Sequence, residues 1–203
     1  MKRFWQLAAA LALIPSVAHA ADVQGEREIL ISRQLPGYTV AQQEVSTTKI
    51  NVVEIPDVQT PDYWTRKITT QWFKQLADDM EQEEYAAEIR SILQQTCPDA
   101  LMSPVRNGKK GGFETFYFRA ICPATDEGNR ITFMLLAFAG KDDMFVKQVA
   151  FRGKATSEDF LWGHDFLNTV RLCKIDSDKK GCPGYKAKRE KGDKKTIFGI
   201  FKI

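Results

Sequence analysis

The stretch FETFYFRAICPATDEGNRITFMLLAFAGKDDMFVKQVAFR, residues 113–152, decides the fold of this chain. It holds three runs rich in aromatic, β-branched and other apolar residues, at 113–121, 130–139 and 144–152. Runs of this length and composition, separated by turn residues, are typical of β-strands. A loop joins the first pair, and a Gly-Lys-Asp-Asp turn joins the second. The stretch therefore predicts an antiparallel meander.

Alternation inside the meander indicates which side chains are buried. Phe116 and Phe118 lie on one face of their strand, and Phe133 and Leu135 lie on one face of the next. An alternative interpretation takes these aromatics, with nearby cations such as Arg119, as a platform for stacking nucleic-acid bases. Apolar alternation on consecutive strands favours a protein core instead. No nucleic-acid partner is expected.

Three more strands are predicted on the N-terminal side of the meander. Alternating runs at 38–45 and 49–55 flank a Ser-Thr-Thr turn, and residues 63–73 favour a strand by residue type. Residues 21–37 form an N-terminal lead, polar except for Ile-Leu-Ile at 29–31, and are expected to be flexible or a first short helix.

A short piece at 102–106 is predicted to open the meander. The sequence Asn-Gly-Lys-Lys-Gly-Gly at 107–112 follows it. Asn-Gly followed by glycines is a strong hairpin signal, so a turn is expected over these six residues.

Two helices are predicted to pack on the sheet. Residues 83–95 show helical periodicity, and Cys97-Pro98 ends this helix because the residue before proline disfavours the α region. Its apolar face carries Tyr85, Ile89, Ile92 and Thr96. A capping-box pattern at 156–159 starts a second helix that covers 157–172 and ends near Cys173. Packing of its Trp162 and Phe166 in the core is favoured over an exposed strip for a partner.

The predicted fold class is α+β: an antiparallel sheet of about six strands with one mid-chain helix and one C-terminal helix packed on it. The chain is divided into a signal peptide at 1–20, an N-terminal lead at 21–37, an α+β domain at 38–175 and a basic flexible C-terminal tail at 176–203.

The N-terminus has the pattern of a secretory signal peptide. Lys2 and Arg3 precede an apolar run at 4–13, and Ala18 and Ala20 form an Ala-x-Ala cleavage site. The apolar run is too short to span a bilayer, which needs about 20 apolar residues. Cleavage is expected after Ala20, which would release the mature protein into the periplasm or beyond.

The order of elements, β-β-β-α-β-β-β-α, in an exported chain of this size resembles the Mog1/PsbP-like fold, including the periplasmic DcrB-like proteins. The resemblance covers most of the mature chain and is carried by the strands and helices named above. It implies a non-enzymatic accessory or binding role and transfers no site residues. The cysteines and the basic tail are not part of the pattern.

Four cysteines suggest two structural disulfides in an exported protein. Of the three possible pairings, Cys97–Cys122 and Cys173–Cys182 are favoured, because the first would join a helix end to a strand end and the second closes a short loop. A metal site or a redox pair is the alternative. The sequence has no C-x-x-C and no zinc-ligand spacing, so neither metal nor cofactor is expected.

Charge is distributed unevenly along the chain. The precursor has 29 Lys+Arg and 26 Asp+Glu, and nine of the basic residues lie in the tail against four acidic ones. An apolar segment ends this tail, and its candidate partner-binding residues are Lys194, Lys195, Ile197, Phe198, Ile200 and Phe201. The segment could dock on a partner sheet, contact an anionic membrane surface or fold back on its own domain.

No catalytic residue is predicted. His164 is the one histidine outside the signal peptide, and Asp165 beside it points about 100° away on a helix. The acidic pairs at 78–79, 83–84 and 142–143 could serve a hydrolase, but adjacent carboxylates in turns and helix starts are usually solvated or capping.

These observations predict an exported periplasmic or secreted protein without enzymatic activity. It would act as an accessory or binding protein of the cell envelope or of a secretion assembly, with an envelope protein as partner. The alternatives are a small-ligand carrier, recognisable by an apolar cavity, and a secreted hydrolase that uses paired carboxylates.

Overall fold

The computed structural model describes residues 23–24, 28–123 and 130–174, which form two antiparallel sheets and three helices. The elements in chain order are β1 (Val23–Gln24), β2 (Glu28–Ile31), β3 (Tyr38–Val45), β4 (Lys49–Pro56), β5 (Arg66–Phe73), α1 (Leu76–Asp79), α2 (Gln82–Thr96), β6 (Leu101–Met102), β7 (Arg106–Lys110), β8 (Phe113–Cys122), β9 (Ile131–Ala139), β10 (Met144–Arg152), α3 (Ser157–Thr169) and β11 (Arg171–Lys174).

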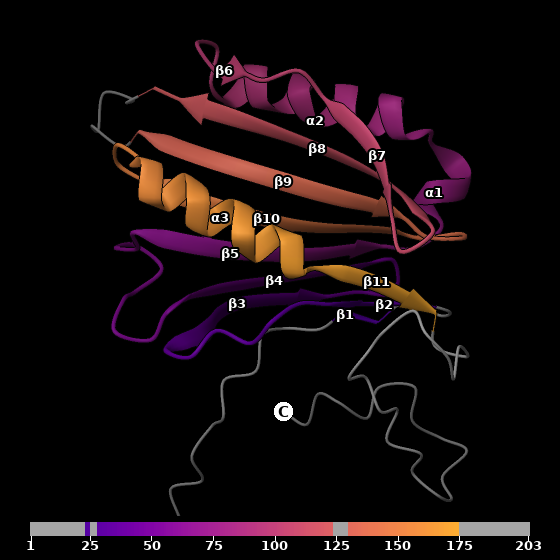
Figure 1. The fold of residues 1–203 in the computed structure, drawn as a ribbon, viewed down its shortest axis with the longest axis horizontal. Helices are drawn as coiled ribbons and strands as arrows, with labels where there is room; N and C mark the ends of the chain where they lie inside the picture. Colours follow the sequence, from indigo (N-terminus) through magenta and orange to yellow (C-terminus); the bar gives the residue numbers. More distant parts are fainter. Residues whose placement is uncertain (1–22, 25–27, 124–129, 175–203) are drawn as a thin grey trace, which may run out of the picture.

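The large sheet has eight strands in the order β3-β4-β5-β10-β9-β8-β6, with β7 also paired to β8. A small sheet of order β1-β2-β11 lies in front of it together with α3, whereas α2 runs along the β8 end (Figure 1). The meander predicted from residues 113–152 is confirmed as β8, β9 and β10, and the α+β class is confirmed with it.

Each face of the large sheet has its own core, because side chains alternate along every strand. On β10, Phe145, Val149 and Phe151 pack toward α3 and the small sheet. Met144 and Val146 face the other way and pack in the core that α2 covers. The protein is therefore a three-layer structure, with α2 on one side of the sheet and α3 plus the small sheet on the other.

The four aromatic and apolar positions predicted as core are confirmed. Phe116, Phe118, Phe133 and Leu135 are all buried on the α2 side. The predicted mid-chain helix is also confirmed, but its buried face is different: Ile92 is 50% exposed. The residues that pack are Tyr85, Ala86, Ile89 and Leu93.

The expectation of about six strands is wrong, and so is that of a flexible or helical lead at 29–31. β2 is a buried strand of the small sheet, where it pairs with β11 over Glu28–Ile31. The second helix also ends earlier than predicted, because Val170 adopts extended backbone angles and Arg171–Lys174 forms β11. The two strands lie far apart in sequence and satisfy one another's backbone groups, a pairing that local periodicity does not reveal.

The turn predicted over 107–112 is placed too broadly. Asn107 and Gly108 lie within β7, paired with Phe116 and Thr115. The reversal occupies only Gly111 and its neighbour Gly112, whose φ values of 64° and 88° suit glycine. The strand expected at 102–106 is correspondingly divided between β6 and β7.

The predicted Cys97–Cys122 disulfide is confirmed, with Cα atoms 5.9 Å apart. It ties the end of α2 to the end of β8. Cys173, on β11, is not a free thiol. Its predicted partner Cys182 lies outside the described residues, as do the signal peptide and the tail. In the part of the chain that the structure describes, every helix is too short or too polar to cross a membrane.

Candidate functional site

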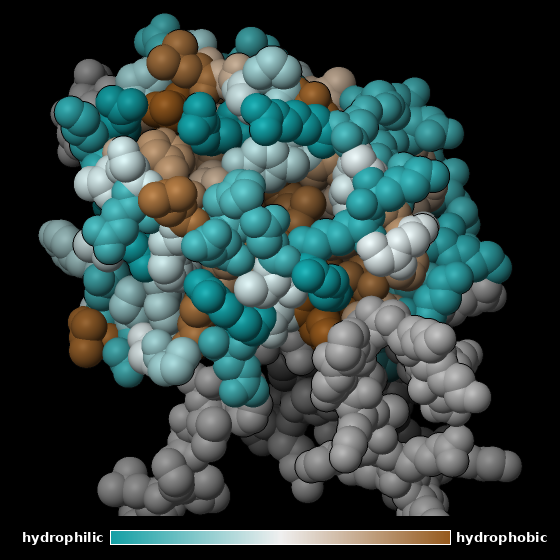
Figure 2. Space-filling model, viewed as in Figure 1, coloured by the Kyte–Doolittle hydropathy of each residue, from teal (hydrophilic) through white to brown (hydrophobic). Residues whose placement is uncertain are grey.

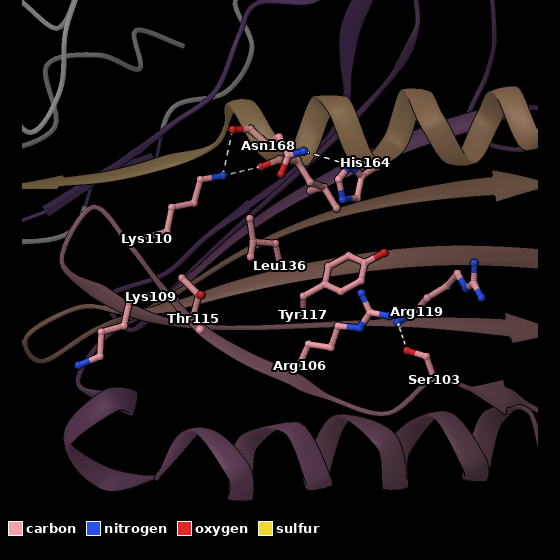
Figure 3. Close-up of a pocket in the computed structure, with 12 residues that line it drawn as sticks. Ser103, Arg106, Lys109, Lys110, Thr115, Tyr117, Arg119, Leu136, His164 and Asn168 are labelled. Carbon is pink, nitrogen blue, oxygen red and sulfur yellow. Dashed lines mark hydrogen bonds between the residues drawn. The ribbon is translucent and has the colours of Figure 1, made fainter.

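A groove of about 430 Å³ lies between the β7–β8 hairpin and the C-terminal half of α3 (Figure 3). This volume falls in the range of small-molecule sites. We call it the basic groove, and it is lined by Ser103, Arg106, Gly108, Lys109, Lys110, Thr115, Tyr117, Arg119, Leu136, His164, Leu167 and Asn168. On the face shown in Figure 2, hydrophilic side chains cover most of the surface between α3 and β7, with hydrophobic patches between them.

The register of three strands sets the residues on the sheet side of the groove. Arg106 on β7 lies opposite Tyr117 on β8, which in turn lies opposite Leu136 on β9. Alternation places Gly108 and Lys110 on the same face as Arg106. β7 thus places one cation at each end of the groove. The residues that form the floor of the groove are half-buried or buried.

Two guanidinium groups flank the phenol of Tyr117 at one end of the groove. Burial raises the pKa of Tyr117, while the positive charges of Arg119 and Arg106 oppose that rise. Arg119 lies over the Phe160 ring at 5.0 Å from its centroid, and its backbone N–H donates to Ser103 Oγ at 3.0 Å. These contacts hold the Arg119 guanidinium at the start of α3 and leave its N–H groups available to a ligand.

His164 and Asn168 stand one helical turn apart on α3 and line the opposite wall. The Asn168 amide nitrogen lies 3.0 Å from His164 Nδ1. His164 adds an imidazole ring to this wall of the groove.

Lys110 forms the other end of the groove against the C-terminus of α3. Its Nζ donates to the carbonyl oxygens of Leu167 at 3.2 Å and Asn168 at 2.9 Å. A cation is favourable at this end of a helix. Burial, assisted by the charge of Arg171, lowers the pKa of Lys110 to about 8. The ammonium group has three donors, so one remains for a ligand.

Three of the four Lys and Arg residues that line the groove have no carboxylate partner among the residues that the structure describes. Among the described residues, no Asp or Glu forms an ion pair with Arg106, Lys110 or Arg119. Lys109 differs from them: it points away from the groove (Figure 3) and pairs with Glu114. Clustered like charges without counter-charges produce a positive potential that attracts anions.

Gly108 leaves the middle of the groove open. Its φ is not in the left-handed region, so the backbone does not require glycine there. A Cβ at this position would meet only Thr115 Oγ1, at an ordinary 3.5 Å. The missing side chain therefore makes space between Arg106 and Lys110.

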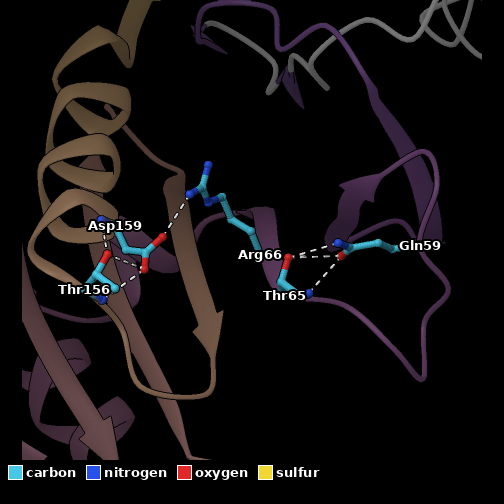
Figure 4. Close-up of polar contacts among 5 residues, drawn as sticks. All are labelled: Gln59, Thr65, Arg66, Thr156 and Asp159. Atoms are coloured by element: carbon cyan, nitrogen blue, oxygen red, sulfur yellow. Dashed lines mark hydrogen bonds and ion pairs between the residues drawn. The ribbon is translucent and has the colours of Figure 1, made fainter.

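The start of α3 is fixed to the sheet, which sets the position of the groove wall. Thr156 and Asp159 form the predicted capping box, and Arg66 Nη2 on β5 lies 2.9 Å from Asp159 Oδ1 (Figure 4). The same guanidinium lies 4.0 Å from the centroid of Trp162. Trp162 stacks on the buried ring of Phe166, so both aromatics pack inward, as predicted.

A buried polar cluster lies beside the groove, in the same register row on the next strands of the large sheet. Lys147 on β10 lies opposite Leu136, and its Nζ donates to Thr70 Oγ1 at 2.6 Å. Glu54 Oε2 is 3.8 Å from the same nitrogen, and both charged side chains are almost fully buried. This cluster is enclosed between the sheet and α3, so it supports the groove from below and does not line it.

The structure describes only some of the candidate site residues that were named from the sequence. His164 and Arg119 line the groove, whereas the tail residues Lys194, Lys195, Ile197, Phe198, Ile200 and Phe201 lie outside the described residues. Sequence reasoning missed Arg106, Lys110 and Tyr117. The available signal was the pattern Arg-x-Gly-x-Lys, which puts two cations on one face of a strand.

The acidic pairs suggested for a hydrolase lie on separate elements. The pair at 78–79 is on α1, and the pair at 83–84 is in the first turn of α2, where Glu84 completes a capping box with Glu81. Asp143 is buried and accepts from Trp72 Nε1 at 2.8 Å and from the backbone N–H of Gln75 at 3.0 Å. The contacts of Glu84 and Asp143 are structural.

No family model matches the chain, and no curated protein matches it. Solved structures give a Mog1-like resemblance, as the order of elements predicted. The Ran-binding protein Mog1p of Saccharomyces cerevisiae is 10% identical, with a TM-score of 0.45 over 70% of this chain and 88% of that one. A Mog1 mutant is 10% identical, with a TM-score of 0.47 over 77% and 96%.

A third solved structure is LpqN, involved in cell envelope biogenesis of Mycobacterium tuberculosis. It is 13% identical, with a TM-score of 0.36 over 72% of this chain and 90% of that chain. Identities this low carry no residue roles to this chain, so the site rests on its own geometry.

Proposed function

We propose that this chain is an exported, non-enzymatic binding protein of the cell envelope, and that the basic groove is its ligand-binding surface for an anionic group. The observation that carries the proposal is the presence of Arg106, Lys110 and Arg119 along one groove with no carboxylate paired to them among the described residues. Keeping like charges close together costs stability, and an anionic ligand would offset that cost.

Export is supported by the leader sequence and by the Cys97–Cys122 disulfide, since such bridges persist in oxidising compartments. The anionic ligand could belong to an envelope protein or to a small molecule that the protein carries. The groove favours a polar anion over the apolar cargo of a lipid carrier, because its rim is cationic and only its floor is apolar.

The tail is a separate part of this proposal. Its nine basic residues and apolar end suit weak contact with an anionic membrane or a partner. Deleting 186–203 should weaken binding to phosphatidylglycerol vesicles and leave anion binding in the groove unchanged. A truncated protein that floats with vesicles as well as the full mature chain would remove the tail from the proposal.

Isothermal titration calorimetry of the mature protein with pyrophosphate tests the groove. We expect binding in low salt, and an Arg106→Ala/Arg119→Ala variant should lose at least about 100-fold in affinity, since each of the two charge-assisted bonds contributes about 1.5–3 kcal/mol. Lys109→Ala is the matched control, because it removes a neighbouring positive charge that points away. Equal losses in both variants would show a diffuse charge effect and contradict a site in the groove.

A further inference from the structure

The basic groove has two separate cationic ends, and this shape restricts the ligand further. We call them the arginine pole (Arg106 and Arg119, flanking Tyr117) and the lysine pole (Lys110). Figure 3 shows the lysine pole beside the end of α3 and the arginine pole at the opposite end of the groove. Arg106 and Lys110 are four residues apart on β7, so their Cα atoms are about 13 Å apart at about 3.3 Å per residue.

The space between the poles is uncharged. Gly108 contributes no side chain, Thr115 lies opposite it on β8, and Leu136 also lines the groove. Lys109, the remaining cation of β7, points out of the groove and is paired with Glu114. A ligand that contacts both poles therefore needs a neutral middle that is thin enough to lie over the glycine.

The arginine pole suits phosphate better than carboxylate. A carboxylate has two oxygens and is satisfied by one guanidinium fork. Arg106 and Arg119 offer two forks, and the charges of both act on the Tyr117 phenol, which lines the same groove. A tetrahedral phosphate with three terminal oxygens can accept from all three groups.

We propose that the basic groove binds an elongated ligand with two phosphate groups, one at the arginine pole and one at the lysine pole, joined by a neutral linker that crosses Gly108. This inference rests on the proposed function and specifies the ligand class for the same site. A soluble bisphosphate and the diphosphorylated headgroup of a glycolipid share this chemistry.

Two probes of equal charge and different length test the spacing by calorimetry. Octanediol bisphosphate is long enough to reach both poles, whereas ethanediol bisphosphate can occupy only one. Binding of the second phosphate is then intramolecular, so the long probe should bind at least about tenfold tighter than the short one. Dodecanedioate, the dicarboxylate of similar length, should bind more weakly than octanediol bisphosphate.

Two variants locate the effect. Gly108→Val fills the space between the poles without changing any charge and places a strand-forming residue in β7, so the long probe should lose its advantage while the short probe keeps its affinity. Lys110→Ala should have the same selective effect by removing the lysine pole, and it serves as the second variant if Gly108→Val fails to fold. Thermal unfolding of each variant checks the fold.

The outcomes separate this inference from the proposed function. Equal binding of the long and short probes, both weakened by Arg106→Ala/Arg119→Ala, would overturn the two-pole ligand and leave an anion site. Tighter binding of dodecanedioate would overturn the phosphate assignment. If neither bisphosphate binds, the proposed function itself fails. Vesicles that carry a diphosphorylated glycolipid, competed by octanediol bisphosphate, identify a lipid source, and vesicles that do not bind identify a soluble one.

Discussion

Removing the Cys97–Cys122 bridge should destabilise the mature protein by about 3.5 kcal/mol. The two cysteines are 25 residues apart. Loop-closure entropy for a loop of that length gives about 12 cal/mol/K, or about 3.5 kcal/mol at 25 °C. The variant is Cys97→Ala/Cys122→Ala, because each alanine is smaller than the cysteine side chain that it replaces.

The loss should be concentrated at the end of α2. This helix buries only Tyr85 and Ala86 fully, and Ile92 in its last turns is half exposed. The bridge therefore adds to the few restraints on the C-terminal half of the helix, which are the packing of Leu93 and the hydrogen bond from Arg90 to the Ser103 carbonyl. Without it, hydrogen exchange of the α2 amides after residue 90 should accelerate more than exchange in β9.

Equilibrium denaturation in urea measures the global effect, and Gln94→Ala at the same helix end is the control, with an expected change below about 0.5 kcal/mol. Oxidised wild type and the double variant are compared in the same buffer. A difference under about 1 kcal/mol, with α2 exchange unchanged, would refute the view that this bridge holds the helix to the sheet.

Three further predictions concern packing and charge. Gly163→Ala should destabilise the protein by about 1 kcal/mol in urea denaturation, because the new Cβ would lie 2.8 Å from Met134 Sδ. This overpacking outweighs the gain in helix propensity. A variant more stable than wild type would contradict this prediction. Lys147→Met should cost about 3 kcal/mol by leaving Glu54 buried without its cation, and adding Glu54→Leu should restore most of that loss in a double-mutant cycle. Burial lowers the pKa of Lys110 from 10.5 to about 8, so between pH 8 and pH 10.5 the unfolded chain binds more protons than the folded protein. The free energy of unfolding should therefore rise with pH in this range. Anion affinity should fall as the pH increases through 8, because Lys110 loses its charge. Lys110→Arg should abolish that fall, and a pH-independent affinity in wild type would refute the role of Lys110.

The long strands of the large sheet could be predicted because each carries its own signal. Phe116 and Phe118 alternate with polar residues, and the turn at 140–143 closes with a hydrogen bond from Gly140 N–H to the Asp143 carbonyl, as its residue types predict. These are local properties. The class of fold therefore followed from the sequence, although the number of strands did not.

The small sheet could not be predicted because its strands stabilise each other across the whole chain. Residues 29–31 are short and apolar, which fits a strand or a helix equally well. Arg171–Lys174 continues the residue pattern of α3 and becomes a strand through its pairing with β2. Only tertiary pairing resolves such segments.

The basic groove depends on tertiary structure even more strongly. Its cations come from β7 and β8, and α3 supplies the opposite wall; Arg106, Tyr117 and Leu136 meet because they are in register. The strong Asn-Gly signal at residues 107–108 also gave a wrong prediction, because it favoured a turn where β7 continues. An alternating Arg-x-Gly-x-Lys run before a glycine pair is the local feature that could have identified the strand.

The most direct test of the account is an NMR titration of the ¹⁵N-labelled mature protein with pyrophosphate. The account predicts saturable shifts confined to amides of β7, β8 and the C-terminal half of α3, centred on Arg106, Tyr117 and His164, with β3 and β4 unchanged. Shifts that spread over all basic surfaces without saturation, or that appear only in the tail, would contradict the assignment of this groove as the anion-binding surface.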